Sequence, residues 1–160
     1  MSETVGKVVA ISISAERGVQ KTNVDSARLI EDSGIEGDAH AGPGIRQVSF
    51  LALESIDEMR ARGAAVNPGD FAENITTEGV KHTQAPVGSG IRIGETELEV
   101  TKIGKECHSR CAIFEQVGDC VMPREGYFAK VVTGGTIRPG DTVRVFPPAD
   151  ARQDLTPAGS

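Results

Sequence analysis

The sequence has no long apolar run, and this lack excludes a membrane-spanning helix. Its apolar stretches extend over only a few residues, far short of the roughly 20 that a membrane helix needs. The first residues, MSETVGKVVAISIS, have an acidic start and no extended apolar segment, so we expect no signal peptide. The protein is therefore predicted to lie in the cytoplasm, without a membrane partner.

Clusters of basic residues are also absent, and cysteine is rare. The 17 lysines and arginines are outnumbered by 23 aspartates and glutamates, which gives a net charge of −6. Because an acidic chain without a basic run is a poor ligand for polyanions, we expect no nucleic-acid partner. Three cysteines are an odd number and too few for a disulfide scaffold. Reduced thiols are expected, as is usual in the cytoplasm.

Aromatic residues make up only 4% of the 160 residues, with no tryptophan and one tyrosine, but the apolar fraction of 38% is enough for the core of one domain. Glycine and proline are frequent, with 19 and 8 residues. They divide the chain at intervals of roughly ten residues, which is typical of short strands joined by turns. The sequence thus predicts a mainly β protein.

Most of the predicted elements are strands. Gly6–Ser14 alternates and is rich in β-branched residues, so we expect a strand there. The best helix candidate is Ala52–Arg62, because Leu53, Ile56 and Met59 follow helical spacing. Further strands are expected at Ser26–Glu31, Gln47–Leu51, Glu73–Thr77, Ile91–Ile93, Thr96–Ile103, Tyr127–Val132 and Asp141–Phe146.

About eight short strands with one good helix favour a closed or half-closed β-barrel with a few short helices. The segment Ile91–Ile103 predicts a hairpin in which Leu98 and Val100 share one face. Turns are expected over Thr133–Gly140. We predict one domain over residues 1–147, followed by a polar tail over residues 148–160 that we expect to be disordered.

The reactive chemistry of the sequence concentrates in one segment. Residues 107–120, CHSRCAIFEQVGDC, contain all three cysteines. The thiolate is the reactive form of cysteine, and nearby cations favour it. Lys105, His108 and Arg110 all lie within three residues of Cys107. A thiol in this setting can serve as a nucleophile, a sulfur carrier, a redox sensor or a metal ligand.

Two other interpretations of the cysteines stay open. Cys120 stands before two apolar residues and is expected to be buried as a small hydrophobic residue. A structural zinc site would use Cys107, Cys111 and Cys120 together with His108. Against it, the adjacent Cys107 and His108 are awkward as joint ligands.

A glycine-rich loop, Gly34–Gly44, holds a second group of polar residues. Asp38 and His40 could coordinate a metal, or Asp38 could form hydrogen bonds only within the loop. The glycines fit neither the Walker A nor the dinucleotide-binding pattern. Arg46 opens the next strand, where a guanidinium can bind an anion or form a surface ion pair. Asn74 stands where a buried amide often satisfies backbone groups.

Four sequence blocks occur in the order and approximate spacing of a known family. They are GIEGDAHAG, RQVSFLALESID, PGDFAENITTEGV and VGSGIRIGETELEVTKIGKEC. From about Gly6 to Phe146 the chain resembles the MOSC domain, the C-terminal domain of molybdenum cofactor sulfurases, in the form of a stand-alone bacterial protein. The resemblance implies a β-barrel related to that of pyruvate kinase and binding of the molybdenum cofactor (molybdopterin). No cysteine desulfurase domain is recognised, so the activity is expected to be independent of pyridoxal phosphate.

The resemblance also implies roles for individual residues. A count without gaps places the family's cysteine at Cys107, whereas the pair Arg110–Cys111 resembles the R-C pair of the sulfurase branch and would place it at Cys111. In the oxidoreductase relatives the same cysteine ligates molybdenum, which makes Cys107 the metal-ligand candidate. Arg46, Gln47 and Asn74 match family positions near the pterin pocket. The sequence departs from the family after the cysteine, and the further residues that we expect to bind the cofactor are His108, Arg110 and Arg124.

Three functions stay open at this point. The leading hypothesis is a molybdopterin-binding protein that carries sulfur as a persulfide on Cys107, with Cys111 as a resolving or relay thiol. The alternatives are a non-catalytic module that binds and delivers the pterin, and a component of a molybdenum-dependent reductase with Cys107 as metal ligand. The expected partners are a cysteine desulfurase or molybdopterin-biosynthesis protein as donor and a molybdoenzyme as acceptor.

Overall fold

The computed structural model describes residues 4–14, 22–39, 41–42, 44–45, 47–69, 73–104 and 125–148. Strands predominate in these ranges, beside one α-helix, α1, and one short 3-10 helix, η1. In chain order the elements are β1 (Thr4–Ile13), β2 (Thr22–Val24), β3 (Ala27–Ile30), β4 (Gly34–Ile35), β5 (Val48–Ala52), α1 (Leu53–Ala61), β6 (Ile75–Glu78), η1 (His82–Gln84), β7 (Ser89–Ile93), β8 (Thr96–Ile103), β9 (Tyr127–Thr133), β10 (Gly135–Ile137) and β11 (Thr142–Pro148).

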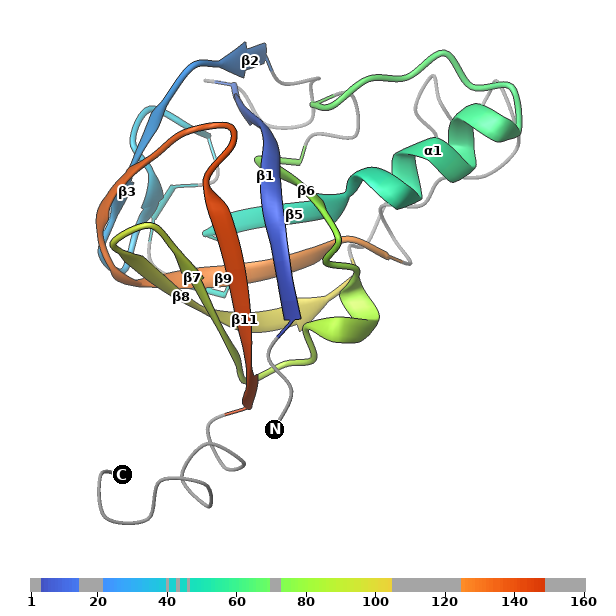
Figure 1. Cartoon of the computed structure of the whole chain (residues 1–160). Coiled ribbons are helices and arrows are strands. Elements are labelled where there is room, and N and C mark those ends of the chain that lie inside the picture. The colour runs from blue at the N-terminus through green and yellow to red at the C-terminus, as the bar shows by residue number, and fades with distance from the viewer. Residues whose placement is uncertain are drawn as a thin grey trace.

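Seven of the strands form a closed barrel, as the sequence predicts (Figure 1). Each is hydrogen-bonded to the next in the order β11, β7, β8, β9, β5, β6 and β1, and the pairing of β1 with β11 closes the ring. β2 extends the sheet by pairing with the second half of β1. Closure removes the free edges that an open sheet of this length would expose.

The barrel has one parallel pair, β5 and β6, and α1 explains it. Antiparallel strands can be joined by tight turns, whereas a parallel pair needs a crossover connection. α1 supplies this crossover on the outside of the barrel (Figure 1). Its buried Ile56 and Met59 pack with Leu51 of β5 and Phe128 of β9 in a second apolar cluster. The predicted helix is therefore confirmed to within one residue at each end.

The barrel interior is filled with aliphatic side chains. Leu98 and Val100 of β8 both point inward and are fully buried, as the alternation of that strand predicts. Phe50 and Tyr127 add a stacked aromatic pair with ring centroids 5.1 Å apart. In an eight-strand barrel side chains just fill the interior, and the seven strands of this barrel likewise enclose a packed core.

A small second sheet, in the order β10, β3 and β4, lies against the end of the barrel at which β8 begins and β9 ends. The sequence predicts turns over Thr133–Gly140, but β10 forms within that segment. Gly134 permits the close approach, because a Cβ there would lie 2.6 Å from the carbonyl oxygen of Leu29. Strand pairing across such long sequence separations leaves little local signal.

The barrel ends with β11, which runs to Pro148. The residues to which the prediction of a disordered tail mainly refers, 149–160, lie outside the described part of the chain. In the part that is described, no helix has the length and apolar character needed to cross a membrane.

Candidate functional site

The segment that carries all three cysteines connects β8 to β9. The described chain on its two sides comes together, since the backbone N–H of Gly104 donates to the carbonyl oxygen of Gly126 at 2.6 Å. Residues 105–124 themselves lie outside the described part of the chain. The predicted roles of Cys107, Cys111, His108, Arg110 and Arg124, and the zinc alternative that includes Cys120, therefore stay predictions.

The junction of β8 and β9 lies at the end of the barrel where α1 begins. Ile103 pairs with Tyr127, and Tyr127 pairs in turn with Phe50 of β5. Next to the junction, the Ser55 hydroxyl of α1 donates to the Glu125 carboxylate at 2.5 Å. The first turn of α1 thus forms one wall beside the place where the cysteine segment returns to the barrel.

The loop before β5, of which residues 41–42, 44–45 and 47 are described, approaches the outer wall of the barrel close to this junction at Ile45. The hydroxyl of Thr101 on β8 lies within hydrogen-bond distance of the carbonyl oxygen of Ile45, and 3.2 Å from that of Phe128 on β9. Ile45 is 54% exposed. Arg46 lies outside the described residues, but its neighbours Ile45 and Gln47 place the backbone on either side of it.

Gln47 is a buried anchor of this loop, with only 1% of its surface exposed. Its side-chain Nε2 donates to the Asp32 carboxylate and to the carbonyl oxygen of Gly44, both at 3.1 Å. Its Oε1 accepts from the backbone N–H of Val131 on β9 at 2.9 Å. Both amide hydrogens are used within the protein. A direct contact with a cofactor stays a prediction, whereas the geometry shows that Gln47 joins Gly44 of this loop to Asp32 and to β9.

Asn74 has a similar role immediately before β6. Its side-chain Oδ1 accepts from the backbone N–H of Ser49 on β5 at 2.9 Å, and its Nδ2 donates to the carbonyl oxygen of Ser12 on β1 at 3.1 Å. It is fully buried. Asn74 therefore joins three strands and satisfies backbone groups, one of the two uses that the sequence left open. Its predicted cofactor contact is untested.

The glycine-rich loop uses Asp38 as a structural residue. Its Oδ1 accepts from the backbone N–H of Ser14 at 3.0 Å, and its side chain is almost fully buried. His40, the suggested second metal ligand, lies outside the described residues. Across the described ranges, no group of three or more histidine, cysteine, aspartate or glutamate side chains is arranged to hold a metal ion.

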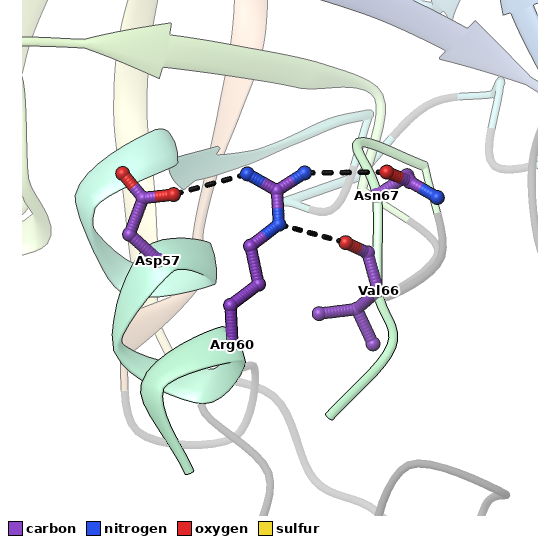
Figure 2. Close-up of polar contacts among 4 residues, drawn as sticks. All are labelled: Asp57, Arg60, Val66 and Asn67. Carbon is purple, nitrogen blue, oxygen red and sulfur yellow. Dashed lines mark hydrogen bonds and ion pairs between the residues drawn. The ribbon is translucent and has the colours of Figure 1, made fainter. Parts of the chain in front are cut away.

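Arg60 organises the loop after α1, residues 62–69 (Figure 2). Its Nε donates to the carbonyl oxygen of Val66 at 2.9 Å, while its two terminal nitrogens bond Asp57 at 3.0 Å and Asn67 at 3.2 Å. The same loop ends in a buried contact, since the backbone N–H of Gly69 donates to the Glu73 carboxylate at 2.9 Å. The last of these contacts joins the loop to the residue directly before Asn74.

Tyr127 is the buried titratable group nearest the junction. Its hydroxyl donates to the carbonyl oxygen of Val80 at 3.3 Å inside the barrel. Burial raises the pKa of Tyr127 well above the ordinary value of 10.0; a hydrogen bond with Thr77 opposes this shift, and the charge of Glu54 adds to it. The phenol stays neutral, so it is a structural group rather than an acid or base at neutral pH.

Three supporting residues were not predicted from the sequence. Each of them holds a loop in place through contacts that form only in the folded chain. They are Thr101, Asp32 and Arg60. The alternation of β8 gives a weak signal for Thr101, because it places that hydroxyl on the outer face. Nothing in the sequence around Asp32 indicates its partner. For Arg60, the i,i+3 spacing to Asp57 on the helix indicates the ion pair, but nothing indicates the bonds to Val66 and Asn67.

Comparison with known proteins agrees with the barrel. The YuaD protein of Bacillus subtilis has a TM-score of 0.76 at 18% identity, with 90% of this chain and 97% of that chain covered. YiiM of Escherichia coli has a TM-score of 0.61 at 18% identity, covering 88% of this chain and 70% of that one. YiiM of Geobacillus stearothermophilus has a TM-score of 0.60 at 18% identity, covering 91% and 76%. These similarities concern the fold.

A search of curated proteins finds no match. The family comparison is decisive, because the model of the MOSC domain matches residues 36–144, more than half of the chain. That range includes the loop before β5, the β5–α1–β6 crossover, the cysteine segment and most of the barrel strands. The chain belongs to the MOSC domain family, which is associated with binding of the molybdenum cofactor.

Proposed function

We propose that this protein binds the molybdenum cofactor and carries sulfur as a persulfide on Cys107 during cofactor maturation in the cytoplasm. One observation supports the proposal above all. The hydroxyl of Thr101 on β8 contacts the carbonyl oxygen of Ile45, the residue before Arg46. β8 then leads to Gly104, three residues before Cys107. The loop that carries Arg46 and the strand that leads to Cys107 are therefore in contact on the outer wall of the barrel.

Short tethers support a shared site for Arg46 and Cys107. Three residues of extended chain span at most about 11 Å, so the position of Gly104 limits how far Cys107 can lie from β8. Arg46 is joined directly to Ile45. A ligand with a phosphate at one end and a sulfur-reactive centre at the other can therefore contact both segments.

The chemistry of the residues fits such a ligand. A guanidinium is suited to bidentate binding of phosphate, and a thiolate is a soft donor. When bound, the cofactor would supply a molybdenum centre that accepts sulfur. The barrel interior is filled, with Leu98, Val100 and Tyr127 fully buried, so the ligand is expected on the outer wall, where Ile45 is exposed.

The sulfur step proceeds by thiol exchange at Cys107. The Cys107 thiolate attacks the terminal sulfur of a persulfide on the donor protein, a cysteine desulfurase or molybdopterin-biosynthesis protein. A new sulfur–sulfur bond forms as the donor's bond breaks, and the donor leaves as a thiolate. Lys105, His108 and Arg110 favour the thiolate form of Cys107. Cys111 serves as the relay thiol, and a molybdoenzyme is the final acceptor.

Native mass spectrometry of untagged protein, purified without oxygen, tests the proposal. We expect a pterin-sized adduct and a reducible adduct of about 32 Da, the mass of one sulfur atom. Cys107→Ser should remove the sulfur adduct and leave the pterin, whereas Cys120→Ser, the matched control, should retain both.

The other outcomes separate the alternatives. Loss of the sulfur adduct in Cys111→Ser but not in Cys107→Ser would move the carrier to Cys111. Pterin without sulfur in every variant would indicate a binding and delivery module. A single zinc ion, with unfolding on chelation, would make the cysteines a structural site and contradict the proposal.

A further inference from the structure

Thr101 occupies an irregular position in β8. The strand pairs with β9 through Val100–Ala129 and then through Lys102–Phe128, so Thr101 is an extra residue on the β8 side. An extra residue of this kind is a β-bulge, which bends the strand and changes the direction of a side chain. Here the bulge presents a hydroxyl on the outer wall, next to the carbonyl oxygens of Ile45 and Phe128.

The two peptide carbonyls before Arg46 are held by different side chains. Gly44 offers its carbonyl oxygen to the Gln47 amide at 3.1 Å, and Ile45 offers its own to the Thr101 hydroxyl. Gln47 is fixed to β9 through Val131, whereas Thr101 belongs to β8. The backbone that enters Arg46 is therefore held from two strands.

Gly44 gives the backbone the shape that this arrangement needs. Its φ of +132° lies in a region that strains any residue with a side chain. Among the described residues other than its chain neighbours, no atom lies within 4 Å of the position where its Cβ would stand. The glycine is thus required for the path of the chain, and an open space alone would not permit alanine.

We propose that Thr101 is a positioning residue that sets the Arg46 loop relative to the cysteine segment, so that both can contact one phosphate-bearing pterin. The inference rests on the proposed function. β8 is the strand that leads to Cys107, so the Thr101–Ile45 contact is the direct link between the two segments. Gln47 holds the loop to β9, to Asp32 and to Gly44. Holding the loop in place before binding lowers the entropy lost when a ligand is bound.

A double-mutant cycle tests this role. Thr101→Val removes the hydroxyl at almost constant volume, and Arg46→Met removes the guanidinium. The probe is molybdopterin released anaerobically from a purified molybdoenzyme, and the readout is its Kd for the full-length protein. We expect Thr101→Val to raise the Kd about tenfold, the effect of one lost hydrogen bond. In the Arg46→Met background, the same change should alter the Kd less than about twofold.

Two further variants keep the cycle interpretable. Thr101→Ser retains the donor and should restore the wild-type Kd. Thr142→Val changes an exposed threonine of β11 on another part of the barrel and should have no effect. A wild-type Kd in Thr101→Val, or an equal loss with and without Arg46, would overturn the proposal, because the threonine would then act independently of the guanidinium.

A second readout needs no ligand. Trypsin cleaves after arginine, so the rate of cutting at the Arg46–Gln47 bond reports how firmly the loop is held. Thr101→Val should accelerate this cut about tenfold, whereas Thr101→Ser and Thr142→Val should not. Faster cutting without any pterin binding by the wild type would overturn the proposed function and the recognition role of Thr101, leaving a structural contact only. Unchanged cutting would overturn the positioning role itself.

Discussion

The loops on either side of the β5–α1 unit are held by opposite kinds of group. The loop before β5 depends on Gln47, a neutral amide that is 1% exposed and forms three hydrogen bonds. The loop after α1 depends on Arg60, a charged side chain that is 39% exposed and also forms three. The two side chains therefore form the same number of hydrogen bonds within the described residues, one in the interior of the protein and the other at its surface.

The difference in environment decides what each contact contributes. Removing one partner of a buried hydrogen bond leaves the other group with neither water nor protein as a hydrogen-bond partner. The resulting loss of folding free energy is larger than the net contribution of the bond itself. At the surface, water replaces the lost partner, and exposed ion pairs contribute little. We infer that the described residues of the loop before β5 are fixed in position, as the role proposed for Arg46 requires, whereas the loop after α1 tolerates change.

The strongest test of the comparison is Gln47→Leu. Leucine has a similar volume but leaves the backbone N–H of Val131 without its partner inside the barrel wall. We expect the free energy of unfolding to fall by about 3 kcal/mol, as measured by urea denaturation.

Gln84→Leu is the matched control, because Gln84 is exposed and its Oε1 accepts the backbone N–H of Lys81 at 2.8 Å. Its cost should stay below about 1 kcal/mol. Equal costs at the two glutamines would mean that burial does not distinguish the loops.

This contrast also explains what could be predicted from the sequence. The alternation of β8 and the helical spacing of Leu53, Ile56 and Met59 are local patterns, and the barrel strands and α1 follow from them. β10 and the Gln47–Asp32 contact join residues that are distant in the chain, so no local pattern reports them. Gln47 was predicted from family resemblance as a cofactor contact, but its hydrogen bonds are visible only in the folded chain.

Tyr127 extends the contrast to the barrel interior and to alkaline pH. Burial raises the pKa of Tyr127 above 10.0, so above pH 10 the unfolded chain loses a proton that the folded chain keeps. Stability contributed by the neutral phenol is complete well below pH 10 and falls as the pH rises, with a total loss of about 1.4 kcal/mol by pH 11. Because the chain has one tyrosine, its ultraviolet absorbance reports this ionisation directly.

At pH 11 the folded protein should show no tyrosinate absorbance, and unfolding in urea at that pH should produce it. Tyr127→Phe is the control, because it should remove only the part of the alkaline loss of stability that the phenol causes. Tyrosinate absorbance from folded protein at pH 11 would contradict the buried neutral phenol.

Arg60→Met tests the exposed side of the comparison. Methionine preserves most of the aliphatic stem while removing the bonds to Val66, Asp57 and Asn67. We expect a loss of about 1 kcal/mol in urea denaturation, reduced at high salt because part of it is the ion pair with Asp57. Asp57→Asn removes only that pair and should cost less. A loss as large as that of Gln47→Leu would show that the loop after α1 is also rigidly fixed.

The smallest effect is expected at Glu54, which joins the start of α1 to the end of β6. Its carboxylate accepts from the backbone N–H of Gly79 at 2.9 Å, and it is the acidic residue in the first turn of a helix whose N-cap, Ala52, offers no side-chain bond.

Glu54→Gln keeps an acceptor and removes only the charge, so it should lower the free energy of unfolding by about 0.5 kcal/mol, and this loss should disappear at high salt. Glu58→Gln, one turn later on the same helix, should cost nothing measurable. Glu54→Ala removes the acceptor as well and should cost about 1 kcal/mol. If Gln and Ala cost the same, the charge at the helix start, rather than the hydrogen bond, stabilises this exposed contact.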